Sequence, residues 1–287
     1  MANANHFLVT KGMAVDHYEN FPVASLLLPS RLRRPVAVLY AFARSADDIA
    51  DEGDLAPEER LAQLAAYDRE LQRIEAGTVP QQPLFRDLAL VAAEHRLSVA
   101  PLRALLSAFS QDVHVKRYAT FADLLDYCRR SANPVGDLML QLFRAADERN
   151  LRDSDAICSA LQVINFLQDV AIDWDKGRIY LPREDLERFG VSESDIASQA
   201  TGEAWRALMR FEVDRARAMM LSGAGLALRL PGRIGWELRL IVQGGLRILE
   251  RIEQADYDVF RRRPMLGRRD WLRMLGRALR MRAAFRP

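Results

Sequence analysis

The sequence has only two cysteines and three lysines, and each scarcity excludes something. Cys128 and Cys158 form no CxxC pair and no zinc-ligand spacing, so neither a disulfide framework nor a cysteine zinc site is expected. This favours a reducing, cytoplasmic compartment. The net charge is only +2, so the overall charge gives no indication of nucleic-acid binding. We attribute the arginine bias to composition, although Arg also binds carboxylate and phosphate bidentately.

Long apolar runs and alternating apolar–polar runs are also missing. No stretch approaches the roughly 20 apolar residues of a membrane-spanning helix. The first residues, MANANHFLVTKG, contain no apolar core of a signal peptide. We therefore expect a protein that is soluble or at most peripherally attached to a membrane. Because period-2 alternation is nearly absent, the sequence does not predict a β-sheet.

Apolar residues instead recur at three- and four-residue spacing through most of the chain, which is the pattern of amphipathic helices. No internal repeat, low-complexity linker or abrupt change in composition divides the chain. The sequence predicts a single all-α domain over residues 1–287, packed as a helical bundle with long inner helices. The predicted helices are 31–50, 57–76, 83–96, 99–115, 121–130, 133–147, 153–173, 183–188, 193–198, 202–222, 232–253 and 269–283.

An acidic cluster follows the apolar stretch that ends at residue 43. Residues 44 to 54 read RSADDIADEGD. On a helix, Asp47 and Asp51 share one face, Asp48 lies beside them, and Arg44 lies one turn before Asp47. Like charges at this spacing destabilise a helix. Taken alone, the cluster has two equally good interpretations, a solvated acidic helix end or carboxylates placed there for a function.

A second polar stripe runs along an otherwise apolar helix. Residues 161 to 185 read LQVINFLQDVAIDWDKGRIYLPRED. At about 100° per residue, Gln162, Asn165, Asp169 and Asp173 fall in one narrow stripe between apolar positions. Buried polar groups need partners, so a narrow polar stripe on an apolar helix more often lines a cavity than faces bulk water.

The two aspartate pairs together predict a metal site. If their helices face each other across a bundle, four or five carboxylates converge, and such a cluster stays ionised only with cations. Oxygen ligands without His or Cys suit Mg²⁺, which commonly bridges carboxylates and substrate phosphates. The predicted chemistry is metal-assisted ionisation of a diphosphate ester. A central apolar cavity would hold the hydrocarbon and keep water from the carbocation.

The two motifs, DDxxD at 47–51 and NxxQDxxxD at 165–173, resemble the aspartate-rich motifs of the squalene, phytoene and dehydrosqualene synthases. The resemblance covers nearly the whole chain, and it implies the all-α isoprenoid-synthase fold of these head-to-head prenyl synthases. Further matching segments are YAFAR at 40–44, YC at 127–128, Gly136, LQVIN at 161–165, YLP at 180–182 and YDVF at 257–260.

A finer resemblance is to one branch of that family, the hydroxysqualene synthases of bacterial hopanoid pathways. The matching segments are HYENFPVASLLLP at 17–29, ADDIADEGD at 46–54, SANPVG at 131–136 and QGG at 243–245. This branch implies presqualene diphosphate as substrate and hydroxysqualene and diphosphate as products, with water capturing the rearranged cation. Two alternatives stay open: a phytoene, dehydrosqualene or squalene synthase, and a non-catalytic helical scaffold with acidic surfaces.

The sequence also departs from the carotenoid-type relatives. They carry a basic residue where Glu19 stands and a serine where Asn20 stands, and they usually have Arg-Asp where this chain has Gln168 and Asp169. Fewer cations near the phosphates indicate altered diphosphate handling. We therefore expect a site that need not perform the first condensation of two farnesyl diphosphates.

Spacing and resemblance together define the candidate site. The predicted Mg²⁺ ligands are Asp47, Asp48, Asp51, Asn165, Asp169 and Asp173. The residues predicted to bind substrate are His17, Asn20, Arg44, Gln162, Tyr257 and Arg263. Catalytic roles are predicted for Tyr40, Tyr127, Asn165 and Asp169.

Several of these residues have a simpler interpretation. Arg44 could serve only to neutralise Asp47, and Gln162 could satisfy local backbone groups. The tyrosines could be core aromatics with one wet end. Arg263 could belong to a solvated run of charge.

Two further patterns lie outside the candidate site. The glycines at 223 and 225 lack the third glycine and the preceding strand of a dinucleotide fingerprint, which counts against a nicotinamide cofactor. In the C-terminal tail, arginines flank an apolar stripe. The stripe consists of Trp271, Leu272, Leu275, Leu279 and Ala283. A basic amphipathic helix can lie on an anionic membrane, but we favour packing of this stripe on the bundle. The oligomeric state stays open.

Overall fold

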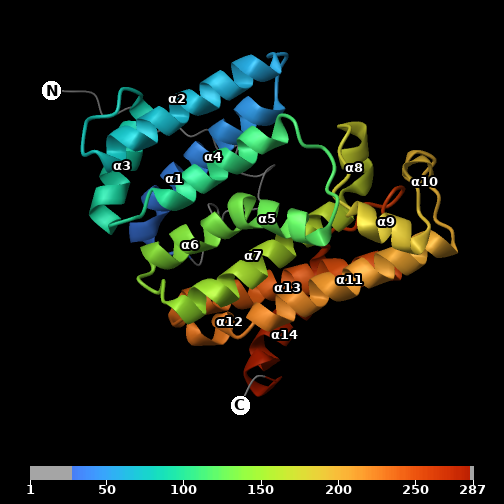
Figure 1. The fold of residues 1–287 in the computed structure, drawn as a ribbon. Helices are drawn as coiled ribbons and strands as arrows, with labels where there is room; N and C mark the ends of the chain where they lie inside the picture. Colours follow the sequence, from blue (N-terminus) through green and yellow to red (C-terminus); the bar gives the residue numbers. More distant parts are fainter. Residues whose placement is uncertain (1–27, 285–287) are drawn as a thin grey trace.

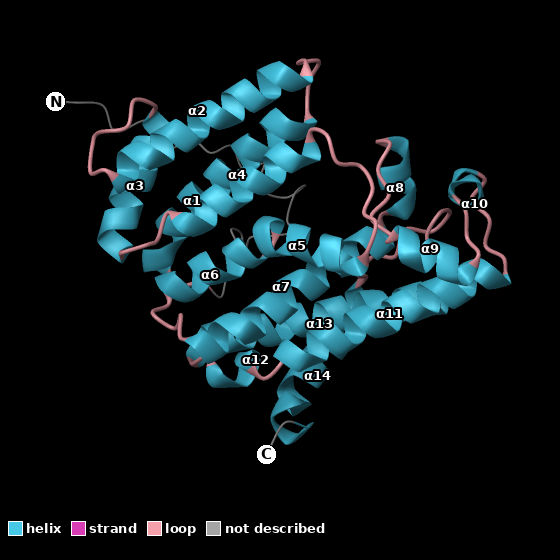
Figure 2. Cartoon of the chain, in the orientation of Figure 1, coloured by secondary structure: helices cyan, strands magenta, loops and turns pink. Residues whose placement is uncertain are grey.

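The computed structural model describes residues 28–284, with side chains described up to Met281, and this part of the chain is built from helices joined by short loops. It contains no strand, only an isolated bridge between Arg117 and Ile179. The predicted all-α class is confirmed (Figure 2). The helices are α1 (Ser30–Asp51), α2 (Pro57–Glu75), α3 (Pro83–His95), α4 (Ala100–Asp112), α5 (Phe121–Ser131), α6 (Asn133–Leu142), α7 (Glu148–Gln168), α8 (Val170–Asp175), α9 (Arg183–Phe189), α10 (Glu193–Ala197), α11 (Glu203–Gly223), α12 (Leu226–Arg229), α13 (Gly232–Gln254) and α14 (Arg268–Ala284).

The helices pack in two groups that meet along α5 and α6 (Figure 1). One hydrophobic core lies among α1 to α4 and includes Leu138 and Leu142 of α6. The other lies mainly among α5, α7, α11 and α13. Helix α4 contacts both α5 and α6, so continuous helix packing joins the two cores. The organisation as one domain stays a prediction.

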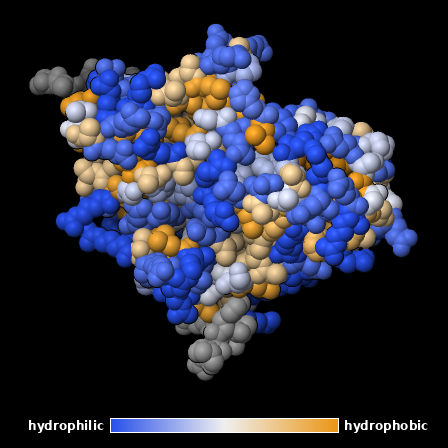
Figure 3. Space-filling model, viewed as in Figure 1, coloured by the Kyte–Doolittle hydropathy of each residue, from blue (hydrophilic) through white to orange (hydrophobic). Residues whose placement is uncertain are grey.

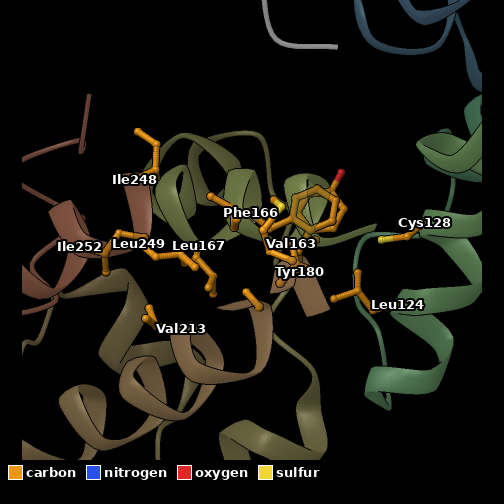
Figure 4. Packing of buried hydrophobic residues seen from close by; sticks show 14 of the residues in the cluster. Leu124, Cys128, Val163, Phe166, Leu167, Tyr180, Val213, Ile248, Leu249 and Ile252 are labelled. Carbon is orange, nitrogen blue, oxygen red and sulfur yellow. The ribbon is translucent and has the colours of Figure 1, made fainter. Parts of the chain in front are cut away.

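Helix α7 lies at the centre of the second core. Val163, Phe166 and Leu167 are at most 6% exposed. Figure 4 shows them between side chains of α5 on one side and of α13 on the other. Burying such a side chain contributes roughly 1.5–3 kcal/mol. The apolar positions of α7 therefore fix its rotation, and with it the direction in which its polar stripe points. The neighbouring side chains on α5 are Leu124 and Cys128, and those on α13 are Ile248, Leu249 and Ile252.

The middle of the chain departs from the predicted helix boundaries. The helix predicted over 153–173 begins earlier, at Glu148, because the Asp147 side chain accepts a hydrogen bond from the Asn150 backbone at 2.9 Å and caps it. It also ends earlier, because Asp169 leaves the helical conformation at φ −109° and ψ 17°. The helix predicted over 133–147 ends at Leu142, and α12 is not among the predicted helices.

Helix α14 packs on α13 through a different face from the one the sequence favours. Trp271 and Leu275 of the predicted packing stripe are about half exposed, at 51% and 48%. That interpretation is therefore wrong. A buried carboxylate, Asp270, turns the helix onto another face. The packed side chains are Asp270, Met274, Ala278 and Met281, each at most 3% exposed.

The surface is mostly polar on the side shown in Figure 3, where hydrophobic residues form patches between hydrophilic ones. None of the helices in the described part of the chain is long and apolar enough to cross a membrane.

Helices α7 and α11 approach each other closely at Gly223. A Cβ atom there would lie 2.3 Å from the backbone carbonyl oxygen of Asp153, which cannot turn away. Gly223 therefore has a role in helix packing.

We expect Gly223→Ala to lower the free energy of unfolding by about 1–3 kcal/mol, because the added methyl group forces α7 and α11 apart. Gly276 on α14 is the matched control, since a Cβ atom there would meet nothing within 4 Å. Gly276→Ala should stabilise the protein by about 0.5–1 kcal/mol. Urea unfolding followed by far-UV circular dichroism measures both variants, and equal stabilities would contradict the close approach.

A buried group of charges joins α9 to α11. Arg215 donates hydrogen bonds to Asp185 at 2.5 Å and to Glu212 at 2.9 Å, and both carboxyl groups belong to residues at most 4% exposed. One guanidinium balances only one of the two negative charges in this low-dielectric setting. Burial, with a further contribution from Asp185, raises the pKa of Glu212 to about 8 despite the opposing charge of Arg215.

This shift makes the stability depend on pH. The pKa of Glu212 is higher in the folded protein than its ordinary value of 4.5, so the bound proton stabilises the fold below 4.5, and that stabilisation is lost as the pH rises through about 8. Glu212→Gln stays neutral, so we expect its Tm to fall less than that of the wild type over this window. Thermal unfolding at several pH values measures the difference, with Glu187→Gln as control, because Glu187 is an exposed residue of α9. Parallel curves for all three proteins would disprove it.

Candidate active site

The first aspartate motif occupies the last turns of α1. The apolar side of this helix is buried in the first core, which leaves Asp47, Asp48 and Asp51 at the partly exposed edge. Arg44 pairs with Asp47 at 3.3 Å, with Asp48 at 2.6 Å and with Glu52 at 2.6 Å. The neutralising role considered for Arg44 is therefore present. Its contact with a diphosphate stays a prediction.

Arg178, which follows α8, reaches across to the first motif. Its two terminal nitrogens donate to both carboxylate oxygens of Asp51, one of them at 2.7 Å. Burial raises the pKa of Asp51, but the hydrogen bonds and charge of Arg178 and the charge of Lys176 outweigh burial and hold the pKa below its usual value. Paired Arg–carboxylate bonds of this kind are strong and geometrically specific. Arg178 is not among the site residues predicted from the sequence.

The second motif is held by the segment that precedes α14. Arg263 donates to both oxygens of Asp169, at 3.0 Å for Nη2. The side-chain amide of Gln168 donates to the backbone carbonyl of Pro264. Both contacts are made where α7 ends, at Gln168 and Asp169. Arg263 therefore lies at the second motif, while its contact with substrate stays a prediction.

Residues of both motifs come together around Arg178. Burial, followed by the charge of Asp169, raises the pKa of Asp173 to about 7, with Asp51 adding to the rise and Arg178 opposing it. Burial, followed by the charge of Asp51, raises the pKa of Asp47 to about 6, and Arg178 again opposes it. The helix break leaves the stripe intact, because the backbone N–H of Asp173 still bonds to the carbonyl of Asp169 at 2.9 Å.

The chemistry of these donors fits a divalent cation. They offer oxygen atoms only, and Asp47 and Asp173 carry raised pKa values that a bound cation would lower. Within residues 28–284, however, no three carboxylate, histidine or cysteine side chains are close enough together to hold a metal ion. In this arrangement Asp51 and Asp169 are bound by arginines.

Asp112 at the end of α4 is a buried acid that is not among the site residues predicted from the sequence. Its Oδ2 accepts a hydrogen bond from the Tyr127 hydroxyl at 2.8 Å, whereas its Oδ1 has no hydrogen-bond partner in the described part of the chain. Burial raises the pKa of Asp112 to about 7, with Asp51 and Asp47 adding to the rise. The sequence does place an acid at the end of an apolar helix here, as it does in the first aspartate motif. However, no second acid follows Asp112 at i+4, so the motif is incomplete.

Tyr127 belongs to a buried group of aromatic rings. Tyr180 stacks on Phe166 with ring centroids 3.7 Å apart and planes 6° apart. Tyr127 lies 6.1 Å from Tyr180 and 5.5 Å from Tyr118, measured between centroids. Burial, followed by the charge of Asp112, raises the pKa of Tyr127 well above its usual value, so its hydroxyl stays protonated. Such ring faces attract cations.

A pocket of about 170 Å³ touches this aromatic group through Tyr118. Arg117 and Glu187 also line it, and no aspartate of either motif does, so it is not the predicted central cavity. That cavity stays a prediction.

Other predicted residues lie along the same helices. Gln162 and Asn165 are half-buried on α7, and no hydrogen bond from either side chain is found among the described residues. The backbone-satisfying role considered for Gln162 is thus not seen. Tyr40 is half-buried on α1, one turn before Arg44, and packs against the first core. The substrate and catalytic roles of these residues stay predictions.

Tyr257 lies against α11. Its backbone carbonyl accepts a hydrogen bond from the Trp205 indole at 2.9 Å, and its ring lies 5.8 Å from the Arg210 guanidinium. These contacts indicate a packing role and do not support its predicted contact with substrate. The predicted diphosphate contacts His17 and Asn20 lie outside the described residues.

Comparisons with known proteins agree with this fold. The squalene/phytoene synthase family model matches residues 14–270. The chain is 34% identical to 15-cis-phytoene synthase of Synechococcus elongatus over 260 residues, covering 85% of this chain and 83% of that one. It is also 34% identical to hydroxysqualene synthase of Zymomonas mobilis over 226 residues, covering 78% and 75%.

A solved structure, that of squalene synthase HpnC from Alicyclobacillus acidocaldarius, matches with a TM-score of 0.78 and 42% identity, covering 84% of this chain and 90% of that one. The chain has the fold of an isoprenoid synthase. It belongs to the squalene/phytoene synthase family.

We expect Arg178→Gln to destabilise the protein by about 3 kcal/mol without metal, because it leaves the partly buried Asp51 unpaired beside Asp47 and Asp173. Mg²⁺ should then raise the Tm of the variant more than that of the wild type. Thermal unfolding in chelator and in Mg²⁺ measures both effects.

The matched control is Arg103→Gln, which removes a pair between Arg103 and Asp68 at 2.8 Å on the surface and should change stability by at most about 1 kcal/mol. If Arg178→Gln behaves like this control, Arg178 does not balance the aspartates.

Proposed function

We propose that this chain is a Mg²⁺-dependent hydroxysqualene synthase that ionises presqualene diphosphate and hydrates the rearranged cation. The observation that carries the proposal is the gathering of aspartates from α1 and from the α7–α8 break around Arg178, beside a buried aromatic group. The charged groups that would bind a metal–diphosphate complex thus lie beside aromatic rings whose faces would stabilise a carbocation. Membership of the squalene/phytoene synthase family supports a prenyl diphosphate as substrate.

The proposed Mg²⁺ ligands come from both motifs. Bound Mg²⁺ would stabilise the diphosphate as a leaving group. Arg178 and Arg263 release Asp51 and Asp169 for metal binding and turn their paired donors to the diphosphate, because a guanidinium binds phosphate and carboxylate with the same geometry. The ligands are Asp47, Asp48, Asp51, Asn165, Asp169 and Asp173.

In the proposed reaction, the C–O bond to the diphosphate breaks and the diphosphate leaves with the electron pair. The cation rearranges, a water oxygen adds to it, and one proton is lost, so no reductant is needed. The faces of Tyr127, Phe166 and Tyr180 would stabilise the cation. Asp112 holds the Tyr127 hydroxyl at 2.8 Å and so fixes the position of that ring.

The hydroxysqualene branch is favoured by the segments at 17–29, 131–136 and 243–245. The 34% identity to a hydroxysqualene synthase also supports it. The 34% identity to a phytoene synthase favours a second candidate, a phytoene, dehydrosqualene or squalene synthase with the same metal chemistry. The identity of the product separates the two.

The test is to incubate the protein with presqualene diphosphate and Mg²⁺ in ¹⁸O-labelled water, without NADPH, and to identify the lipid product by mass spectrometry. We expect an alcohol that carries the label, because the oxygen comes from water. A hydrocarbon product would move the chain to another branch of the family, and no turnover would reject the substrate.

Single variants test the metal site in the same assay. Asp47→Asn and Asp169→Asn should each lower turnover by about 100-fold or more, since each removes a charged ligand from the proposed Mg²⁺ site. Asp175→Asn is the matched control, because Asp175 is an exposed aspartate at the end of α8. Full activity in both ligand variants would contradict the proposed Mg²⁺ site, and no turnover by the wild type would favour the non-catalytic alternative.

A further inference from the structure

Helix α14 exposes an apolar surface that no described element covers. Trp271, Leu272, Leu275 and Leu279 are 51%, 74%, 48% and 58% exposed. They project from one side of the helix, while a separate side packs on α13. The C-terminal end of α14 extends beyond the rest of the bundle (Figure 1). We call this surface, formed by these four residues, the α14 ridge.

Ion pairs fix the orientation of the ridge. Asp270 is 1% exposed and accepts hydrogen bonds from Arg247 at 2.7 Å and from Arg251 at 2.6 Å, both on α13. The backbone N–H of Gly267 donates to the same carboxylate at 2.8 Å. Because breaking a buried pair of this kind is strongly unfavourable, α14 cannot roll to bury the ridge while Asp270 stays in place.

The charge beside the ridge has one sign. Arg269, Arg273 and Arg280 lie at adjoining exposed positions of the helix, and the single acid of α14, Asp270, is buried in its ion pairs. The exposed surface of α14 therefore consists of an apolar arc next to a basic arc. This is the arrangement of helices that lie in the plane of a membrane, where arginines meet anionic headgroups and apolar side chains enter the acyl boundary.

The ridge is also connected to the active site through the chain. Arg263 binds Asp169, Pro264 accepts a hydrogen bond from Gln168, and Met265, only three residues before α14, is 64% exposed. If α14 bound to a surface, the segment before it would therefore connect that surface to the second aspartate motif.

We propose that the α14 ridge docks this protein onto an anionic lipid bilayer. Charge complementarity selects this occupant, because three adjoining arginines would disfavour a second copy of the same basic surface. Docking would bring the active site to a hydrocarbon substrate in the bilayer, and this benefit rests on the proposed function. Docking itself is measured without substrate, so its failure is distinguishable from failure of the reaction.

The experiment is co-sedimentation of the full chain with vesicles of phosphatidylcholine and phosphatidylglycerol, and with vesicles of phosphatidylcholine alone. We expect binding to the anionic vesicles that high salt weakens. Replacing Arg269, Arg273 and Arg280 by Gln should weaken it by roughly 100-fold, since each basic residue near an anionic surface contributes about a factor of five. Replacing Leu272, Leu275 and Leu279 by Ser should weaken binding in both salt conditions.

Matched controls change the same residue types elsewhere. The apolar control combines Val79→Ser, Leu90→Ser and Leu221→Ser, whose side chains are 76%, 59% and 42% exposed on other elements. The basic control replaces exposed arginines on α2, α5 and α7 by Gln. These are Arg69, Arg129 and Arg152. Both controls should bind like the wild type, and circular dichroism checks that every variant is folded.

Three results would overturn the proposal. The first is no sedimentation with anionic vesicles. The second is equal loss in the ridge variants and their controls. The third is self-association, seen by analytical ultracentrifugation, that the leucine variant abolishes while vesicle binding is absent, since a second copy would then cover the ridge.

Discussion

The structure depends on holding several aspartates close together next to an apolar interior. Like charges in a region of low dielectric repel one another strongly. Burial, followed by the charge of neighbouring aspartates, raises the pKa values of Asp47 and Asp173. Arginines offset part of the repulsion: Arg178 pairs with Asp51, and Arg263 pairs with Asp169. The carboxylates therefore remain close together. Part of their negative charge is still uncompensated, and a substrate–metal complex would compensate it.

The irregular segments around the site follow from this pairing. The segment that carries Arg178 is anchored to the chain before α5, because the N–H of Ile179 donates to Lys116 at 3.0 Å and that of Arg183 donates to Tyr118 at 2.9 Å. Helix α7 breaks at Asp169, where Arg263 binds. These contacts join segments that are far apart in the sequence, so the geometry of the site is a property of the whole fold.

The local features were largely predictable from the sequence. Helix positions follow from apolar spacing, which needs only neighbours within a few residues, and the two aspartate motifs are visible for the same reason. Arg178 and Asp112 were not found, because their importance comes from partners across the fold, Asp51 and Tyr127. The break at Asp169 was missed on the same ground, since the residues that hold it lie beyond α13.

Helix α14 separates the two kinds of information most clearly. The sequence by itself determined that the helix has apolar positions, arginines and one acid, because periodicity is written in the chain. Only the tertiary structure decided which apolar side is buried. Asp270 needs the two arginines of α13, Arg247 and Arg251, to compensate a carboxylate that is removed from water. That requirement outweighs the larger apolar stripe, so Trp271 and its neighbours face outward.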